Sequence, residues 1–317
     1  MKVMQFSEYG GPDVLEPAEW PDPEPGRGEV RIRVHAAGVN PVDAKIRKGL
    51  LKERIPNQLP IIPGWDAAGV IDRVGEGVTA WKPGDAVFAY CRKPVIQFGS
   101  YAEYIVLPEG QVARAPRSLT HEEAAAVPLA ALTAYQSLFG AGRLSAGQTV
   151  LIHAGAGGVG GFAIQLAKLS GARIIATGRA DNHAAMRKLG ADHVVDYTAT
   201  DFREAVRSLY PDGIDLAYDT VGGDVQVNSA DVLRPGGTLV SILAFSDEAA
   251  IFARGLHPRY VFVAPNQDEL SRLARWIDDG QVTVRLADVL PLEHAAEAHR
   301  RIESGRTAGK LVLRIRV

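Results

Sequence analysis

Apolar and polar residues alternate along several short segments of the first 116 residues. The clearest is 30–35, where Val30, Ile32 and Val34 fall on one face of a predicted strand. Similar runs, each bounded by turn residues, occur at 69–74, 86–90 and 101–107. This pattern predicts a mostly antiparallel β region.

From about residue 124 the pattern changes to apolar strands that alternate with amphipathic helices. Strands are predicted at 149–153, 173–177, 193–196, 214–219, 238–243 and 260–263, with helices between them at 159–169, 182–189, 201–209 and 224–233. Such alternation indicates a parallel sheet covered on both faces, and six strands suit a doubly wound dinucleotide-binding fold.

The end of the chain returns to the earlier pattern. Helices are predicted at 267–278 and 292–304, and residues 310–317 again alternate like a strand of the first region. The expected fold is therefore α/β, with a doubly wound parallel sheet inserted into a β-rich domain. The predicted boundaries are 1–122 and 266–317 for the β-rich domain and 123–265 for the inserted one.

Charge and composition exclude several classes of partner. The 35 Lys and Arg against 37 Asp and Glu give a formal net charge of −2. This charge does not indicate nucleic acid or an anionic membrane as a partner. No apolar run approaches the ~20 residues of a membrane span, and residues 1–9 show no signal-peptide core. The single cysteine, Cys91, excludes intramolecular disulfides and a zinc lobe of several thiolates. We expect a soluble cytoplasmic protein.

A glycine-rich turn follows the first predicted strand of the inserted domain. It consists of Gly155, Ala156, Gly157, Gly158, Val159 and Gly160, between the strand at 149–153 and the helix at 159–169. In a dinucleotide-binding turn, Gly155 would permit the tight turn, Gly157 would let the backbone approach a pyrophosphate, and Gly160 would permit close helix–strand contact. The N–H groups at the start of the helix would face the phosphates.

Cofactor preference is predicted from the end of the next strand, at Gly178 and Arg179. Folds that bind NAD usually place Asp or Glu there for the ribose hydroxyls, whereas a guanidinium binds a 2′-phosphate. The sequence therefore favours NADPH over NADH. In the alternative interpretation, Arg179 is a solvated charge and Asp181 binds the ribose.

Six motifs, in order along most of the chain, carry a family resemblance. They are Tyr9-Gly10-Gly11-Pro12, Ala36-Ala37-Gly38-Val39-Asn40-Pro41-Val42-Asp43, Pro63-Gly64-Trp65-Asp66-Ala67-Ala68-Gly69, Gly99-Ser100-Tyr101-Ala102-Glu103-Tyr104, Leu132-Thr133-Ala134-Tyr135 and Leu189-Gly190-Ala191-Asp192. The chain resembles the zinc-independent quinone oxidoreductase (zeta-crystallin-like) branch of the medium-chain dehydrogenase/reductase superfamily. The resemblance implies a GroES-like domain, a Rossmann domain, an active site in the cleft between them, and a homodimer formed through the last strand of the nucleotide domain, near 260–263.

The resemblance also implies that the protein holds no metal. Zinc alcohol dehydrogenases of this superfamily carry Cys where this chain has Asn40, and His-Glu where it has Trp65-Asp66. Asn and Trp do not supply the thiolate and imidazole ligands of a catalytic zinc.

Site residues are expected by the same resemblance. Asn40 and Thr133 would lie near the nicotinamide, and Tyr197 would help to hold the 2′-phosphate. Lys45 is similar to the lysine of alkenal/enone reductases in the pattern Asn-Pro-Val-Asp-x-Lys. It would stabilise an enolate or donate its proton if burial lowers its pKa; otherwise it is a surface lysine.

The remaining candidates surround this set. Further cofactor contacts are expected at Val221, Leu243 and Ala244, and Tyr90 and Phe98 are expected to line the substrate mouth beside Asn40 and Lys45. Asp43 and Asp66 form either a polar cluster or helix caps and turns. Cys91 is interpreted as a buried filler and His153 as a strand-end residue.

The predicted function is transfer of hydride from NADPH to a small quinone or α,β-unsaturated carbonyl. Two alternatives stay open: an enoyl reductase of one pathway, with a carrier- or coenzyme-linked substrate, and a non-catalytic NADPH-binding protein. The glycine turn serves all three equally. The presence of Asn40, Lys45 and Thr133 favours catalysis.

Overall fold

The computed structural model describes residues 1–316 and consists of two compact units. Unit 1 contains Met1–Leu132 and the described residues from Ala264 onward, and unit 2 is Thr133–Val263. The insertion expected from the sequence is thus present. The chain leaves unit 1 after Leu132 and not after residue 122, because α2 (His121–Ala125) packs on strands of unit 1.

Unit 1 is built on a seven-stranded sheet. Two smaller sheets, β1 with β2 and β4 with β7, accompany it. The strands of unit 1 are β1 (Lys2–Gln5), β2 (Glu16–Glu19), β3 (Glu29–Val39), β4 (Asn57–Ile62), β5 (Asp66–Val74), β6 (Ala86–Tyr90), β7 (Ile96–Phe98), β8 (Tyr104–Pro108), β9 (Val112–Arg114), β16 (Leu286–Pro291) and β17 (Lys310–Arg314). Its helices are α1 (Pro41–Arg47), α2, the start of α3 (Pro128–Tyr135), α9 (Gln267–Asp278) and α10 (Ala295–Glu303).

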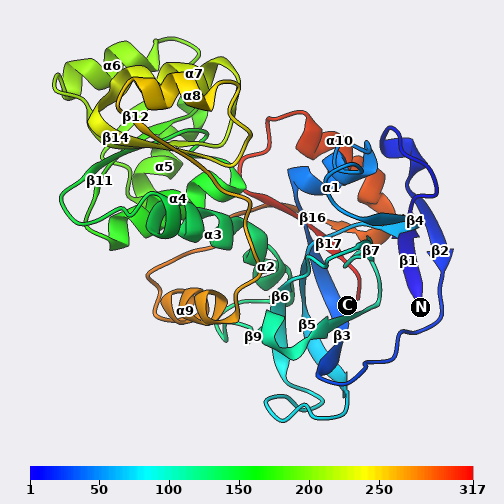
Figure 1. Ribbon diagram of the computed structural model, residues 1–317. Coiled ribbons are helices and arrows are strands. Elements are labelled where there is room, and N and C mark those ends of the chain that lie inside the picture. Colours follow the sequence, from blue (N-terminus) through cyan, green and yellow to red (C-terminus); the bar gives the residue numbers. More distant parts are fainter. Residues whose placement is uncertain (317) are drawn as a thin grey trace. The chain divides into compact units, whose positions relative to one another are not determined.

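The main sheet has the order β16-β17-β3-β5-β6-β9, and β8 also pairs with β3. All of these pairs are antiparallel except β16 with β17, so the prediction of a mostly antiparallel region is confirmed. Strand β17, near the end of the chain, lies beside β3, which belongs to the first part of the chain (Figure 1). Leu311 lies opposite Val39 in this pair. The C-terminal segment therefore completes the domain that the N-terminal segment begins.

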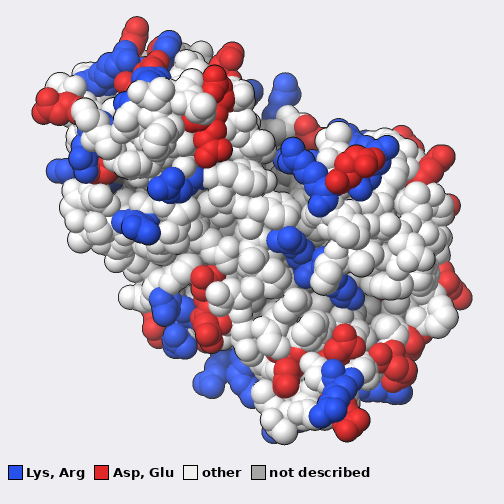
Figure 2. Space-filling view, viewed as in Figure 1, with Lys and Arg blue, Asp and Glu red and all other residues white. Residues whose placement is uncertain are grey.

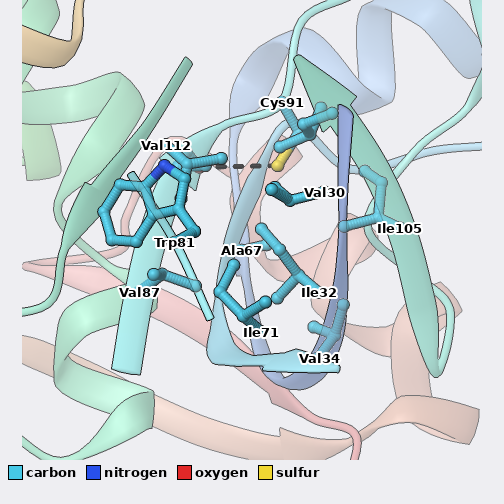
Figure 3. Packing of buried hydrophobic residues seen from close by; sticks show 12 residues of the cluster. Val30, Ile32, Val34, Ala67, Ile71, Trp81, Val87, Cys91, Ile105 and Val112 are labelled. Carbon is cyan, nitrogen blue, oxygen red and sulfur yellow. Dashed lines mark hydrogen bonds between the residues drawn. The ribbon is translucent and has the colours of Figure 1, made fainter. Parts of the chain in front are cut away.

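The alternation that predicted β3 describes its buried face. Val30, Ile32 and Val34 are fully buried and point into one apolar cluster with side chains of neighbouring strands (Figure 3). Burial of a side chain of this size contributes about 1.5–3 kcal/mol. Cys91 belongs to the same cluster, which confirms its interpretation as a filler.

Unit 2 contains a six-stranded parallel sheet with helices between the strands (Figure 1). Its strands are β10 (Thr149–Ile152), β11 (Arg173–Thr177), β12 (His193–Val195), β13 (Ile214–Asp219), β14 (Leu233–Ser241) and β15 (His257–Tyr260), and its helices, after the end of α3, are α4 (Gly158–Leu169), α5 (His183–Leu189), α6 (Phe202–Leu209), α7 (Asp224–Ser229) and α8 (Glu248–Ala253). The order β12-β11-β10-β13-β14-β15 reverses direction at β10, as in the Rossmann fold.

The last strand of unit 2 was predicted at 260–263, and this position is wrong. The strand is His257–Tyr260, paired with β14 so that His257 lies opposite Thr238 and Tyr260 opposite Ser241. The apolar run after Tyr260 suggested a later start. Pro258 is accommodated because β15 is an edge strand, where a missing N–H costs little.

Charged side chains of both signs lie on the surface of the protein. On the face shown in Figure 2, basic and acidic side chains are interspersed. In residues 1–316, none of the helices has both the length and the apolar character needed to cross a membrane.

Candidate functional site

The glycine-rich turn of unit 2 connects β10 to α4. The left-handed backbone residue in it is Ala154, with φ +49°, and not Gly155. Gly155 is required for a different reason: a Cβ there would lie 2.8 Å from Met186 Sδ and 3.0 Å from Ala176 Cβ. The tight-turn role predicted for Gly155 is thus corrected to a packing role.

Gly160 has the role that the motif predicts. A Cβ at this position would lie 2.3 Å from the carbonyl oxygen of Ala154, which is shorter than any tolerated contact. At Gly157 the nearest atom to such a Cβ is the same oxygen, at 3.2 Å. The absence of side chains at these glycines lets α4 begin directly against the end of β10.

The N-terminus of α4 is open to a ligand. Gly157 is its N-cap, no side chain caps it, and its first turn contains no acidic residue. The first N–H groups of a helix have no intrahelical partner and carry the positive end of the helix dipole. The turn at 155–160, including Ala156, Gly158 and Val159, therefore fits the pyrophosphate of a dinucleotide.

The ribose end of the predicted cofactor site lies at the carboxyl end of β11. Gly178 is buried, and a Cβ on it would lie 2.6 Å from Met186 Cε. Arg179 is exposed, and its Nε lies 3.4 Å from the hydroxyl oxygen of Tyr197. Tyr197 is 52% exposed. The structure thus brings together the two side chains predicted to hold a 2′-phosphate, and Asp181 lies exposed nearby in sequence.

A buried carboxylate that the sequence analysis missed organises the next loop. Asp219, at the end of β13, accepts hydrogen bonds at Oδ1 from the backbone N–H groups of Val221 and Gly222, both at 2.8 Å. Its position before the pair Gly222-Gly223 is the signal that would have found it. The predicted cofactor contact Val221 is 49% exposed on the loop that Asp219 fixes.

The same carboxylate connects a second predicted contact loop. Its Oδ2 accepts hydrogen bonds from Ser241 Oγ at 2.6 Å and from Gln226 Nε2 at 3.2 Å. Ser241 Oγ in turn accepts from the N–H of Leu243, and Gln226 Nε2 reaches the carbonyl of Ala244 at 3.5 Å. Asp219 therefore positions both loops expected to contact the cofactor.

His153 and Thr133 are buried within unit 2. The His153 ring lies 3.2 Å from Thr177 Oγ1 and 2.9 Å from Ser229 Oγ, and burial lowers its pKa to about 4. His153 is thus a satisfied strand-end residue, as the sequence suggested. Thr133 is 3% exposed, and its carbonyl lies 3.5 Å from the hydroxyl of Tyr218.

In unit 1 the candidate residues gather at the start of α1. Asn40 is the N-cap, and its backbone N–H donates to Asp43 Oδ2 at 2.8 Å. Asp43 is therefore a helix cap and also a member of a polar cluster, so both alternatives left open by the sequence apply to it. Asp66, the other carboxylate, accepts a hydrogen bond from the N–H of Leu129 at 2.7 Å.

The side chain of Asn40 is enclosed between two charged groups. Its Nδ2 donates to Asp66 Oδ2 at 2.9 Å, and its Oδ1 accepts a short hydrogen bond from Lys310 Nζ. Lys310 also donates to the carbonyl of Val39 at 3.1 Å and lies 3.5 Å from Asp66 Oδ2. Lys310 comes from β17 and was predicted only as a strand residue.

The charges in this cluster are buried, which changes their titration. Burial raises the pKa of Asp43 to about 7 and raises that of Asp66, while it lowers the pKa of Lys310. The hydrogen bond from Asn40 opposes the rise at Asp43, and the Lys310 ammonium opposes the rise at Asp66. Lys310 and Asp66 are thus a buried ion pair that no solvent screens, and the carboxyl group of Asp43 lies buried in the same cluster.

A second buried group anchors the other end of α1. Arg47 has no exposed surface; it donates to the carbonyl of Gly10 at 3.1 Å and to Glu303 Oε1 at 2.8 Å, and its NH1 lies 3.0 Å from His299 Nδ1. Tyr101 joins the two ends, with its hydroxyl 3.3 Å from Asp43 Oδ2 and 3.2 Å from His299 Nε2. Burial lowers the pKa of His299 to about 3.

Lys45 lies between these anchors. Its side chain is half-buried, and within residues 1–316 it makes no hydrogen bond or ion pair. Burial lowers the pKa of its amine. This is the environment that the sequence analysis required for a role in chemistry, because an amine free of carboxylates is available to a developing negative charge.

The two residues predicted for the substrate mouth differ in exposure. Phe98 is 45% exposed and makes an edge contact with Trp20, with ring centroids 5.5 Å apart. Tyr90 is fully buried beside Trp65, and burial raises the pKa of its hydroxyl. Phe98 is thus the one of the pair that presents a surface to a ligand.

Metal ligands do not gather at this site. Asn40 and Trp65 occupy the positions noted in the sequence, and in the part of the chain that the structure describes no group of three or more His, Cys, Asp or Glu side chains could hold a metal ion.

Comparison with known proteins gives two family models. Residues 26–117 match the alcohol dehydrogenase GroES-like domain, and residues 189–313 match the model described as zinc-binding dehydrogenase. Among curated relatives, the chain is similar to the NADPH-dependent alkenal/one oxidoreductase of Arabidopsis thaliana, at 36% identity over 99% of this chain and 79% of that protein. It is also similar to the quinone oxidoreductase of Pseudomonas aeruginosa, at 35% identity over 98% of this chain and 99% of that one.

A solved structure agrees with these relatives. The quinone oxidoreductase of Escherichia coli, determined in complex with NADPH, superposes with a TM-score of 0.90 at 30% identity and covers 99% of this chain and 100% of that one.

Proposed function

The chain belongs to the quinone oxidoreductase branch of the medium-chain dehydrogenase/reductase superfamily, and from this we propose that it is an NADPH-dependent reductase of quinones or α,β-unsaturated carbonyls. The observation that carries the proposal is Lys45, a half-buried amine without a partner in residues 1–316. Binding of the cofactor does not require such a group, whereas stabilisation of a negative substrate oxygen does.

The cofactor choice is supported by two features of unit 2. The uncapped N-terminus of α4 offers backbone N–H groups to a pyrophosphate. The Arg179 guanidinium beside the Tyr197 hydroxyl offers a charge and hydrogen-bond donors to a 2′-phosphate. We propose that these residues, with the loops held by Asp219, bind NADPH in preference to NADH.

The chemistry proposed for unit 1 is stabilisation of negative charge. NADPH, when bound, would supply a hydride to the β-carbon of an enone or to a quinone, which would leave negative charge on the substrate oxygen. The Lys45 ammonium stabilises that oxygen, and its lowered pKa eases transfer of its proton to the product. Thr133 and Phe98 are proposed to contact the nicotinamide and the substrate, respectively.

The test is oxidation of NADPH by the purified protein with a panel of quinones, enones and enoyl thioesters, followed by the loss of NADPH absorbance. We expect turnover with enones or quinones, a loss of about tenfold or more in kcat for Lys45→Met, and an NADPH Kd within twofold of the wild type. The control is Lys82→Met, the same change at an exposed lysine of unit 1.

The panel also separates the alternatives. Turnover confined to enoyl thioesters would indicate the pathway-specific enoyl reductase. Tight NADPH binding without turnover on any substrate would indicate the non-catalytic binding protein and would refute the proposal.

The homodimer and the cytoplasmic location stay predictions. An interface at β15 is supported by its position at the sheet edge and by Tyr260, which is 46% exposed. Light scattering measures the mass in solution, and Tyr260→Glu should produce a monomer if β15 forms the interface.

A further inference from the structure

The helix that carries Lys45 is too short to be stable alone. Helix α1 has seven residues, about two turns, and isolated helices of that length do not persist in water. Its placement therefore depends on tertiary contacts at its two ends. The polar ones are the Lys310 cluster at Asn40 and the Arg47 contacts at the C-terminal end, and between them Ala44 and Ile46 are buried.

We propose that Lys310 is a positioning residue of the reaction, which fixes Asn40 and the start of α1 and thereby the amine of Lys45. The inference rests on the proposed function. It adds a residue from β17, which lies 270 positions from Asn40 in sequence.

The contacts of Lys310 leave its ammonium no freedom. An ammonium has three N–H donors, and the structure gives this one three acceptors: the carbonyl of Val39, Asn40 Oδ1 and Asp66 Oδ2. The side chain is 6% exposed. Lys310 therefore has no donor left for a substrate, and its effect on the reaction must pass through the groups it contacts.

The same contacts determine which way the Asn40 amide points. An ammonium only donates, so the atom that faces Lys310 must be Oδ1, and a carboxylate only accepts, so the atom that faces Asp66 must be Nδ2. Each end of the amide thus has a charged partner, and Asn40 is 1% exposed. Asn40, predicted as catalytic, is accordingly assigned a positioning role with Lys310.

Stability alone does not account for this arrangement. Buried ion pairs often contribute little to stability relative to apolar residues of the same size, since desolvation offsets the attraction. What a buried pair does supply is a defined geometry. Here that geometry is fixed five residues before Lys45, while Arg47 fixes the helix two residues after it.

The experiment is a double-mutant cycle of Lys310→Met and Lys45→Met, measured by steady-state kinetics with the best enone or quinone of the panel. We expect Lys310→Met to lower kcat at least tenfold, with the KM for substrate within threefold and the Kd for NADPH within twofold. In the Lys45→Met background the same change should lower kcat by less than twofold, because its effect passes through Lys45. Lys82→Met serves as the matched control.

Each outcome bears on the proposal. Equal fold losses from Lys310→Met with and without Lys45, or no loss at all, would overturn it. If Lys310→Met fails to fold because Asp66 is left unpaired, the cycle is run with Lys310→Met combined with Asp66→Asn, which removes both charges and lets the Asn40 amide invert. This variant should fold and show the same Lys45-dependent loss; full activity would overturn the proposal. Absence of turnover in the wild type would instead refute the proposed function.

Discussion

The two units build their expected binding groups in different ways. Apart from the side chains of Arg179 and Tyr197, unit 2 uses backbone: the N–H groups of one glycine-rich turn and of two loops. Asp219 holds the first loop directly at Val221 and Gly222, and it holds the second through Ser241, which accepts from the N–H of Leu243. Unit 1 uses side chains from distant segments, and its central hydrogen bond joins Asn40 to a lysine 270 positions away. A backbone-built site is encoded in a few consecutive residues. A site built from side chains exists only after the sheet has brought β3, β5 and β17 together.

The largest effect is expected where unit 2 depends on the absence of a side chain. In Gly160→Ala, the added Cβ would lie 2.3 Å from the Ala154 carbonyl oxygen, so the turn must shift. We expect the free energy of unfolding to fall by about 3 kcal/mol. We also expect NADPH binding to become too weak to detect. Denaturant unfolding and NADPH fluorescence titration measure these quantities.

The neighbouring glycine provides the control for that prediction. At Gly161 the nearest atom to an added Cβ is Leu189 Cδ1 at 3.6 Å, an ordinary contact. Gly161→Ala should therefore bind NADPH like the wild type. If the two variants behave alike, the turn does not depend on close contact between α4 and β10.

The next largest difference is expected in acid, which should destabilise unit 2 more than unit 1. The pKa of His153 lies near 4 in the folded protein, against an ordinary 6.5. Because the unfolded chain therefore binds a proton at higher pH than the folded one, unit 2 loses stability as pH falls from 6.5 to 4. The loss is about 3 kcal/mol at pH 4. Unit 1 has the same liability at His299, whose pKa is about 3. Unit 1 also contains Asp43, whose pKa is about 7 in the folded protein. Its contribution to the stability of unit 1 increases as pH falls through 7, and this gain offsets the stability lost at His299.

We therefore expect unit 2 to open before unit 1 at pH 4–5. Hydrogen exchange at several pH values, corrected for intrinsic rates, should show protection falling first at β10 and β11 rather than at β3. His153→Gln should reduce this difference, and His257→Gln, at an exposed histidine of the same unit, should leave it unchanged. Simultaneous opening of both units would contradict the comparison.

A smaller effect is expected from the carboxylate that fixes the loops of unit 2. Asp219→Ala leaves the N–H groups of Val221 and Gly222 without their acceptor, which costs about 2 kcal/mol. Affinity for NADPH should fall about tenfold, since the loops are no longer ordered in advance. Calorimetric titration measures it, with the exposed Asp212→Ala as control. An unchanged affinity would show that the Asp219 loops do not contact the cofactor.

The last effect, on affinity without a cost in stability, concerns the choice between cofactors. Arg179→Ala removes an exposed guanidinium, and we expect NADPH affinity to fall about tenfold while NADH affinity changes less than twofold. Parallel titrations with the two nucleotides give the ratio, and Arg187→Ala is the control at an exposed arginine of α5. Equal losses for both nucleotides would favour the interpretation in which Asp181 binds the ribose.

What the sequence predicted follows the same division. Local patterns predicted the order of strands and helices in unit 2, the turn at 155–160 and Arg179, whereas Tyr197 was expected from the family resemblance. The packing role of Gly155 could not be predicted from a local pattern, because it depends on contact with Met186, which is distant in the sequence. The partners of Asn40 and of Arg47, namely Lys310 and His299, could not be found from spacing, since both are ordinary residues of a strand and a helix until the chain closes.

The pairing of β17 with β3 has a consequence for how the chain is made. Unit 2 is continuous in sequence, so all of its strands have left the ribosome while the last segment of unit 1 is still to be translated. Until that segment emerges, the 36–39 end of β3 lacks its partner β17, and the carboxylate of Asp66 lacks the ammonium of Lys310. A nascent chain arrested shortly before Lys310 would therefore contain a folded unit 2 and a unit 1 whose sheet has an open edge. Chaperones would recognise this form, and proteases would cut it.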